Sequence, residues 1–558
     1  MQGGRRKYPR DAFPRGVFDS RFMSLQAILN NRKFFYAVLV LAALIGLKLL
    51  FDPIRDFISI VQSRVFLDYN AEWIEGLILD QARLYAKTGN PYPPPSFEFV
   101  PLLYAPGYFF LLQPIVLYSD QPFAHGRMLS LFFFAGSLCF LYVLARTCFS
   151  RIYSALAAIS VIGFYPHTGY WFDLIRVDSA SLFFYMGALA ILTLTIKDSY
   201  KTILVSFWLI FAVSIKQTNL LAALPVLSYW IFQKKYRYFL VQLGILFSLL
   251  LLLFLYWQSK TNGYFLKYAW ELGASHGYIS GDFISSAVIA IELAENLFPD
   301  LTAYLAAICG LFLFAGGLAL YRNIITELKP EPRLIQVEFP RSESYLIFCI
   351  FSLSAIFLFL NIHPGTYLNN NIPLVFALVL LPGLAGNTLI RILSRLKRTE
   401  SLKTILQVLP VVLLLIFINR EMKAGKIMRV FSRPALPPGQ TQEIRNMRKF
   451  LERDDVFAAS FPVGPVTRWR RKSVVHAQSY ADLRNHPELK AEYIRSLKNF
   501  PCDRIKIIIN FPGGTPPCRL EYEKRPFKIE GVSRGAIRPL SGHVPEVRDM
   551  LIVKERRR

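Results

Sequence analysis

The sequence predicts an α-helical polytopic membrane protein with about eleven spans and a small C-terminal α/β extracytoplasmic domain. Three observations lead to this class. The chain of 558 residues is 53% hydrophobic and has a mean hydropathy of +0.35. Apolar runs long enough to cross a bilayer recur between residues 34 and 418. Lys and Arg gather in the short gaps between those runs, which is typical of topology signals and not of a nucleic-acid groove, although the net charge is +26.

The orientation of the spans follows from the basic gaps. With the N-terminus in the cytoplasm, every second gap should also be cytoplasmic, and those gaps hold the Lys and Arg residues. Residues 102–118 contain proline, and a span there would invert every later loop, so we expect an interfacial helix instead. The expected spans are 34–51, 127–145, 152–168, 179–196, 202–215, 219–233, 238–257, 302–320, 345–361, 372–389 and 404–419.

The same pattern divides the chain into three regions. Residues 1–33 form a basic cytoplasmic N-terminus, and no small-residue cleavage site follows the first apolar segment, so we expect an uncleaved anchor. Residues 34–420 form the membrane domain, whose first outer loop covers 52–126. Residues 432–558 form the extracytoplasmic domain.

The C-terminal region is polar and reads as alternating short helices and strands. Cys502 and Cys518 are its only cysteines, and an oxidising exterior would allow a disulfide between them without requiring one. The expected elements are helices near 443–453 and 488–500 and strands near 456–460 and 505–510.

Three charged residues interrupt the apolar stretch 169–192, namely Asp173, Arg176 and Asp178. A charge at the centre of a bilayer costs about 3 kcal/mol on insertion scales, so such residues need an edge, a wet cavity or a partner. The predicted orientation places them at the outer ends of two spans. A cavity at that level could open to both lipid and water.

The first outer stretch carries acids in a fixed order. Asp68, Glu72 and Glu75 open a helix with an apolar side, "TGNPYPPP" ends it, and Glu98 precedes the sequence "PLLY". Taken alone, this is also the pattern of an amphipathic helix whose acids face water.

In this order the motifs resemble the first luminal loop of the GT-C glycosyltransferases. The nearest resemblance is to the bacterial family-39-like enzymes, which are related to the protein mannosyltransferases and to the lipid A aminoarabinose transferase. The resemblance covers about residues 30–390, and the C-terminal domain adds nothing to it. Four further segments carry it: "HGRMLSLFFFAGSLCFLYVLAR" (125–146), "RVDSASLFF" (176–184), "SIKQTNLLAALP" (214–225) and "GTYLNNNIPLVFALVLLPG" (365–383).

The resemblance implies three catalytic acids. Asp68 matches the first-loop acid, the usual candidate for the general base that takes the proton of the acceptor hydroxyl. Glu98 matches the second acid, which lies beside the metal or the phosphate. Asp178 matches the acid at the start of the fourth span. In some relatives a basic residue follows the second acid, but here Phe99 follows Glu98, which shifts the expected phosphate contacts elsewhere.

The resemblance also implies the groups that bind the donor phosphate and a metal. Arg127, Arg176 and Lys216 are the cations placed to hold phosphate. For Arg176 a local ion pair with a neighbouring Asp is a second interpretation, and both can hold. His276, in "ASHGY", matches a metal-ligating His of some relatives, so His276 and Glu98 are the metal candidates, although a lone loop His is often simply solvated.

The implied activity is transfer of a hexose or pentose from a polyprenyl-phosphate donor to an extracytoplasmic glycolipid, polysaccharide or protein. A divalent cation (Mg²⁺, Mn²⁺ or Zn²⁺) would neutralise charge on the departing phosphate. The expected partners are this donor, the acceptor and membrane lipids, with no nucleic acid. The alternatives are a membrane transporter or lipid-linked sugar flippase, in which intramembrane charges are also common, and a scaffold. The lack of an internal repeat and the gathering of polar residues at one membrane face favour the enzyme.

Overall fold

A computed structural model describes the parts of the chain that form the helical body. The described residues are 32–67, 71–72, 74–96, 100–298, 300–310, 341–363, 368–394, 409, 412–420, 456–458, 486–498, 507–509, 522–526 and 549–553. Asp68, Glu98, the predicted helix 443–453, and both Cys502 and Cys518 lie outside them.

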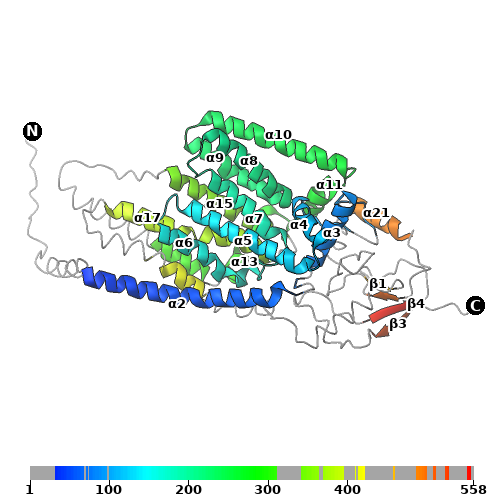
Figure 1. The fold of residues 1–558 in the computed structure, drawn as a ribbon, viewed down its shortest axis with the longest axis horizontal. Coiled ribbons are helices and arrows are strands. Elements are labelled where there is room, and N and C mark those ends of the chain that lie inside the picture. Colours follow the sequence, from blue (N-terminus) through cyan, green and yellow to red (C-terminus); the bar gives the residue numbers. More distant parts are fainter. Residues whose placement is uncertain are drawn as a thin grey trace, which may run out of the picture.

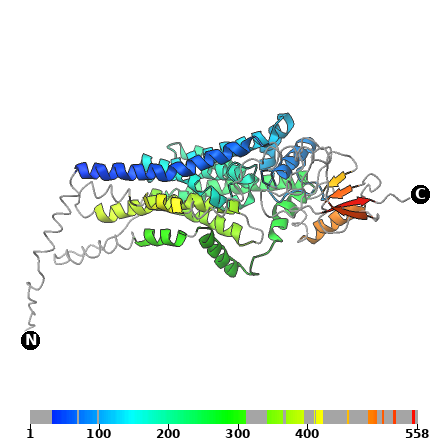
Figure 2. The same ribbon diagram turned by 90° about the horizontal axis from the view of Figure 1, so that it is seen from below.

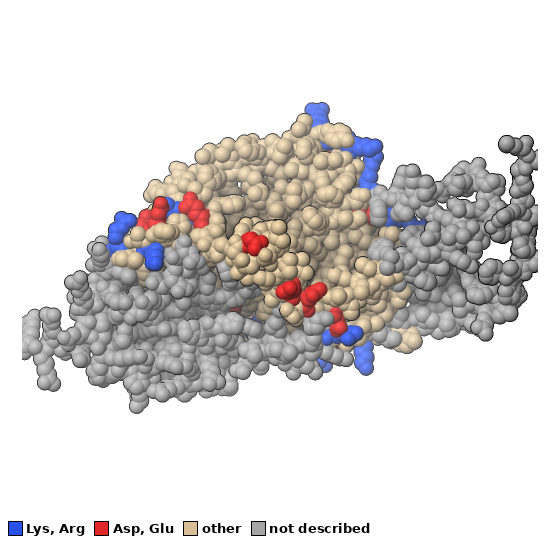
Figure 3. Space-filling model, turned by 180° about the vertical axis from the view of Figure 1, so that it is seen from behind, with Lys and Arg blue, Asp and Glu red and all other residues tan. Residues whose placement is uncertain are grey.

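The described residues form an α-helical polytopic membrane protein. Five helices are long and apolar enough to cross a bilayer, by their length and composition. On the face shown in Figure 3, most of the described surface carries neither acidic nor basic side chains, and Lys and Arg stand at its margins. The five are α5 (Pro122–Ala145), α8 (Asp198–Ile215), α10 (Tyr236–Lys260), α15 (Arg341–Asn361) and the segment Leu368–Thr388, which includes η5 (Leu368–Asn371), α16 (Ile372–Leu378) and the start of α17 (Leu381–Ser394).

Shorter apolar helices complete the body. The predicted interfacial helix at 102–118 is α4 (Gly107–Tyr118), which is too short to span the bilayer. The count of eleven spans stays a prediction, since residues 311–340 and 395–408 fall outside the described part. The remaining helices are α6 (Arg151–Ser160) with η1 (Val161–Phe164) and η2 (Pro166–Thr168), α7 (Val177–Ile191), η3 (Gln217–Ala222), α9 (Ala223–Phe232), α13 (Phe283–Leu297) and the helical residues 301–310 and 412–420.

The first helix is longer than the sequence indicated. Helix α2 (Arg32–Val65) has 34 residues and contains Pro53. At about 1.5 Å per residue it measures roughly 50 Å, well beyond a hydrocarbon core of about 30 Å. Residues 52–65, which open the predicted first outer loop, continue the same helix. The bounds of that loop stay a prediction. Figure 1 shows α2 running along the whole length of the bundle.

Helix α7 lies between α5 and α8 in the middle of the bundle. Its inner side is buried over nearly its whole length, in one apolar cluster that also takes in residues of α5, α8, α15 and α16. Gly187 permits the close approach to α8, since a Cβ atom there would meet the Trp208 ring at 2.3 Å. Dense packing around α7 fixes the position of its first turn, where Asp178 lies.

Several short elements gather at one end of the bundle. They include α3 (Glu75–Thr88) and the segment formed by α11 (Tyr264–Leu266), η4 (Lys267–Glu271) and α12 (Leu272–Ala274). Helix α21 (Pro487–Lys498), predicted at 488–500, packs there through its buried Leu489 and Tyr493. Lys267 Nζ lies 2.9 Å from Glu488 Oε2 and strengthens this contact.

The strands lie at the same end of the molecule as α21 (Figures 1 and 2). Their order is β1-β2-β4-β3; β1 and β2 pair in parallel and the other pairs are antiparallel. The predicted strands 456–460 and 505–510 correspond to β1 and β2. The strands are β1 (Val456–Ala458), β2 (Ile507–Ile509), β3 (Tyr522–Pro526) and β4 (Asp549–Val553).

The contact between α7 and α8 gives a stability prediction. Gly187→Ala should lower the thermal unfolding midpoint in detergent, because overpacking a dense interface costs about 1–3 kcal/mol. Gly244→Ala on α10 is the matched control, since a Cβ there meets nothing within 4 Å and Ala favours helix over Gly. A Gly187→Ala protein as stable as the Gly244→Ala protein would contradict the close approach.

Candidate active site

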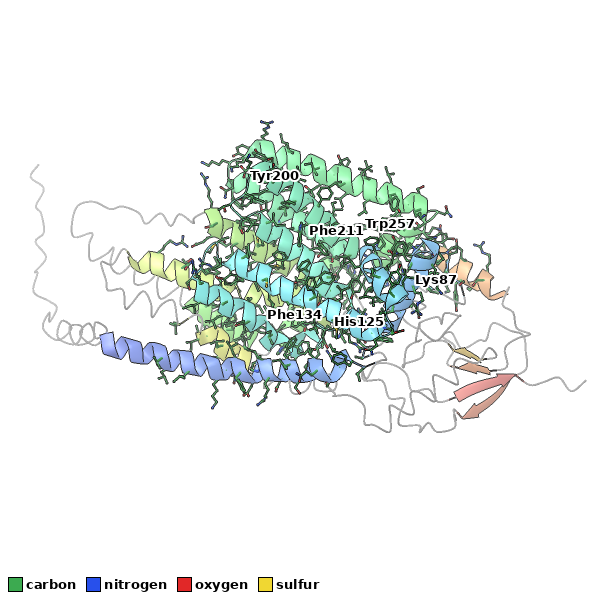
Figure 4. The ribbon with its side chains drawn as sticks, viewed as in Figure 1. Lys87, His125, Phe134, Tyr200, Phe211 and Trp257 are labelled. Carbon is green, nitrogen blue, oxygen red and sulfur yellow. The ribbon has the colours of Figure 1, made fainter. Side chains whose placement is uncertain are left out.

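The described site residues come from the ends of helices on the α3 side of the bundle. Figure 4 shows Tyr200, near the start of α8, far from Lys87, and Phe211 closer to Lys87 and Trp257. The end of α8, which Lys216 follows, thus points toward the end of the bundle that holds α3 and α21. Arg176 directly precedes α7, so both residues reach the same level.

The first buried charge is neutralised from a distant helix. Asp173 is fully buried and pairs with Arg64, near the end of α2, whose Nε lies 3.1 Å from Asp173 Oδ2. The Arg64 guanidinium also donates to the Tyr165 hydroxyl (2.5 Å) and to the Tyr170 carbonyl (2.6 Å). Asp173 therefore links α2 to the loop before α7. Of the two neighbouring Asp residues considered as partners of Arg176, Asp173 is the one that pairs with Arg64 instead.

A second buried pair holds Arg127. Its Nε and Nη2 lie 3.0 and 2.7 Å from the two carboxylate oxygens of Glu75, and its Nη1 donates to the carbonyls of Arg64 (2.9 Å) and Leu67 (2.6 Å). Both side chains are fully buried. Glu75 also accepts the backbone N–H of Ile175 at 3.0 Å. This pair joins α3, α5 and the start of α7, and Arg127 is not among the residues that line the cavity described below.

Asp178, Lys216 and Arg176 form the third group. Lys216 Nζ donates to Asp178 Oδ1 at 2.8 Å, and the amide of Asn369 donates to the same oxygen at 3.0 Å. Arg176 Nε lies 4.0 Å from Asp178 Oδ2. Arg176 and Lys216 both adopt extended backbone conformations at helix boundaries, which lets their side chains turn toward one point. The sequence prediction that these three residues lie together agrees with this geometry.

Arg176 is held by more than Asp178. Its Nη2 donates to the Tyr104 hydroxyl at 2.7 Å, and its Nη1 lies 3.5 Å from Glu72 Oε2. The guanidinium also lies over the Trp171 ring, 4.4 Å from the centroid, a favourable cation–π distance. Glu72, Tyr104 and Trp171 were not singled out from the sequence as partners of Arg176. Only the acidic character of Glu72 gave any signal.

A large cavity opens beside these cations. It has a volume of about 770 Å³, and Arg176, Lys216 and Asn369 line its polar end. Its walls are mainly apolar and include Leu221 and Leu360. Three further apolar wall residues are exposed: Leu220 (40%), Leu224 (50%) and Phe359 (45%).

His276, which the sequence analysis gave as a metal candidate, also lines this cavity, and so does His363, which the sequence analysis missed. The His363 Nδ1 lies 2.6 Å from the Gly277 carbonyl, and its ring stacks on Tyr278. Within the described residues no group of three His, Cys, Asp or Glu side chains gathers where an ion could bind. The other metal candidate, Glu98, is outside the described residues, so the predicted metal site stays a prediction.

Glu72 and Glu75, three residues apart, have opposite electrostatic environments. Burial raises the pKa of the Glu72 carboxyl to about 7, and Arg176 only partly opposes this shift. Burial acts on Glu75 in the same direction, but the Arg127 guanidinium and backbone N–H donors hold the Glu75 pKa below its ordinary value. Glu75 is thus a permanently ionised structural anion, whereas Glu72 can change its charge near neutral pH.

No family model matches the chain, and no curated protein matches its sequence. Its fold is similar to that of several solved structures. ArnT from Cupriavidus metallidurans, bound to undecaprenyl phosphate, has a TM-score of 0.49 and 10% identity, over 85% of this chain and 93% of that chain. The oligosaccharyltransferase of Archaeoglobus fulgidus, tethered to an acceptor peptide, has a TM-score of 0.46 and 11% identity, over 86% and 69% of the two chains.

A second structure of the archaeal enzyme contains Zn and sulfate, and matches with a TM-score of 0.39 and 14% identity over 74% of this chain and 55% of that chain. At such low identities, the roles of individual residues have to be argued from the contacts within this chain.

The Arg127–Glu75 pair can be tested by a double-mutant cycle. Arg127→Met should destabilise the protein by about 3–5 kcal/mol, because it leaves the Glu75 carboxylate buried without its cation. Adding Glu75→Gln should restore part of the lost stability, since the uncompensated charge is then removed. Thermal unfolding of both single variants and the double variant measures this. A double variant no more stable than Arg127→Met would contradict the assignment of the pair as a structural link.

Proposed function

We propose that this chain is a membrane glycosyltransferase that takes a sugar from a polyprenyl-phosphate donor and transfers it to an acceptor outside the membrane. One observation carries the proposal: a cavity that is lined by two cations, the buried Arg176 and the half-buried Lys216, and otherwise mainly by apolar side chains. Such a cavity is complementary to a molecule with an anionic head and a long hydrocarbon chain.

The polar end suits a phosphate group. Arg176 and Lys216 both line the cavity, and among the described residues Asp178 is the carboxylate that lies close to both, while Glu72 lies close to Arg176 alone. A charge-assisted contact between a guanidinium or ammonium group and a phosphate oxygen is strong where water is excluded. Arg127 does not share this role in our proposal, because its donor atoms are bound to Glu75 and to two carbonyl groups.

The apolar end suits a prenyl chain. Leu220, Leu224 and Phe359 belong to η3, α9 and α15, helices of the apolar body, and all three are exposed at the cavity. In a bilayer these side chains would meet lipid, so a donor could enter from the side without leaving the hydrocarbon layer. Burial of each CH₂ group of the chain contributes about 0.8 kcal/mol only when that group leaves water. A prenyl chain that enters from the bilayer is already out of water, so the phosphate end must provide the specificity.

The chemistry follows from the charge on the phosphate. The acceptor hydroxyl attacks the anomeric carbon, and the bond from that carbon to the phosphate oxygen breaks. The donor is a phosphodiester with one negative charge, and the departing phosphate gains a second. Arg176 and Lys216 would therefore bind the transition state more tightly than the ground state, which lowers the barrier.

The remaining predicted roles fit around these two cations. We assign Asp68 as the base that takes the proton of the acceptor hydroxyl. We assign Asp178 as the carboxylate that positions Lys216, because Lys216 donates a hydrogen bond to it. Glu98 and His276 are the residues that would hold a divalent cation; when bound, it would supply further positive charge for the phosphate. No step above depends on it. We place the active site and the C-terminal domain on the extracytoplasmic side.

Binding of undecaprenyl phosphate to detergent-solubilised protein tests the proposal. Arg176→Gln and Lys216→Gln should each weaken binding by roughly 10- to 100-fold, as expected for loss of a charge-assisted contact of about 1.5–3 kcal/mol. Lys87→Gln is the control, because it removes an exposed cation at the same end of the molecule. Neutral undecaprenol should bind all variants with similar, weak affinity.

A double variant separates phosphate binding from simple neutralisation. If Lys216 served only to neutralise Asp178, then Lys216→Gln with Asp178→Asn would recover wild-type affinity. We expect the double variant to remain weak, because removal of the acid does not restore the cation. Equal affinity of wild type and both single variants would refute the proposal. Binding without sugar transfer to any envelope acceptor would favour a flippase.

A further inference from the structure

Among the charged contacts that Arg176 makes within the described residues, Glu72 is the one that the proposed chemistry does not use. It lies in the segment between α2 and α3 and is 5% exposed. Its Oε2 accepts the Ile74 backbone N–H at 3.0 Å and lies 3.5 Å from Arg176 Nη1. Its Oε1 is buried and accepts no hydrogen bond from any residue in the described part of the chain. The carboxylate is therefore stabilised mainly by Arg176.

Glu75 shows how a permanently charged carboxylate is held in the same segment. It has a bidentate Arg127 and accepts backbone N–H groups from Ala71, Glu72 and Ile175. Glu72 has one backbone donor and a more distant cation. The two residues are equally buried in practice, so the difference lies in how well each negative charge is compensated.

A phosphate at the cavity would compete for the same cation. Arg176 lines the cavity and is the only cation in contact with Glu72 among the described residues. An anion bound to Arg176 adds a like charge close to the Glu72 carboxylate and draws away the cation that stabilises it. Both effects favour the neutral carboxylic acid over the carboxylate.

We propose that Glu72 is a positioning residue that holds Arg176 as a carboxylate when the site is empty and takes up one proton from solvent when the donor phosphate binds to Arg176. In the neutral form Glu72 no longer repels the phosphate, and Arg176 is released to bind it. The inference rests on the proposed function in so far as the ligand at Arg176 is a lipid phosphate. No bond other than the O–H bond of Glu72 forms in this step.

The groups around Glu72 agree with such a response. Burial places the pKa of the Glu72 carboxyl at about 7, so that near neutral pH a small change in its surroundings alters its charge. Arg176 acts to lower this pKa, whereas Glu75 on α3 and Asp178 on α7 act to raise it. Tyr104 faces Arg176 from the segment before α4 as a neutral hydroxyl. His276 and His363 line the same cavity and are the imidazole groups there.

The test is the pH dependence of binding of methyl undecaprenyl phosphate. This probe is a phosphodiester with one permanent negative charge, so its own ionisation does not change between about pH 6 and pH 8. The protonated form of Glu72 binds the probe better, so affinity should fall as the pH rises. If binding raises the Glu72 pKa by about one unit, affinity falls by about fivefold over this range. Calorimetry in buffers of different ionisation enthalpy should show proton uptake of about half a proton at pH 7.

The Glu72→Gln variant should bind the probe with an affinity that is nearly independent of pH and close to that of wild type at low pH. A purely structural role would change its affinity by the same factor at every pH. Asp56→Asn is the matched control, because it removes an exposed acid at the end of α2 and should keep the wild-type profile. His276→Gln and His363→Gln should also keep the fall in affinity with rising pH, whatever their absolute affinity.

The outcomes separate the two proposals. Wild-type protein that does not bind the probe at any pH would refute the proposed function itself. Wild-type protein that binds the probe without pH dependence or proton uptake would refute only the role of Glu72. If a His variant lost the pH dependence of binding while Glu72→Gln kept it, the role of Glu72 would also be refuted. The effect would then be assigned to that histidine.

Discussion

Pairing of buried charges is the constraint on which the rest of this structure depends. In a body surrounded by lipid, an isolated ion is far too costly to bury, so each buried cation at the site end of the bundle has to meet a carboxylate. Arg64 meets Asp173, Arg127 meets Glu75 and Lys216 meets Asp178. In each pair the two residues come from segments far apart in the sequence. The pairs therefore act as links that fix how α2, α3, α5, α7 and α8 come together.

The arrangement distinguishes charges that hold the fold from charges that are available to a ligand. The Arg64 and Arg127 guanidinium groups use their donors on carboxylate, hydroxyl and carbonyl oxygens of the protein. Arg176 and Lys216 instead line the cavity, where one carboxylate, Asp178, lies close to both. The first two links keep α7 and its preceding loop rigid, and that rigidity places Arg176 at the polar end of the cavity. The proposed binding of phosphate by Arg176 therefore depends on these two structural ion pairs.

The sequence predicted much of this arrangement, but not the partners. The class of fold and the gathering of Arg176, Asp178 and Lys216 follow from local hydropathy and charge patterns. The proline residues indicated that no span covers 102–118, where the structure has the short helix α4. The pairing of Arg127 with Glu75 could not be predicted, because nothing local shows that residues 52 positions apart will pair. The link between Arg64 and Asp173 spans 109 positions and was missed for the same reason. The length of α2 was underestimated because polar residues at the end of a span do not stop a helix.

The account makes one central claim, that the cavity beside Arg176 and Lys216 holds a prenyl phosphate with its chain along the apolar walls. Photo-crosslinking tests it most directly, with an undecaprenyl phosphate analogue that carries a diazirine near the middle of its chain. We predict that mass spectrometry will place the adduct on η3, α9 or α15, near Leu224 or Phe359. We also predict that undecaprenyl phosphate will compete for labelling while undecaprenol will not. Labelling of other helices, or equal competition by undecaprenol, would contradict the claim.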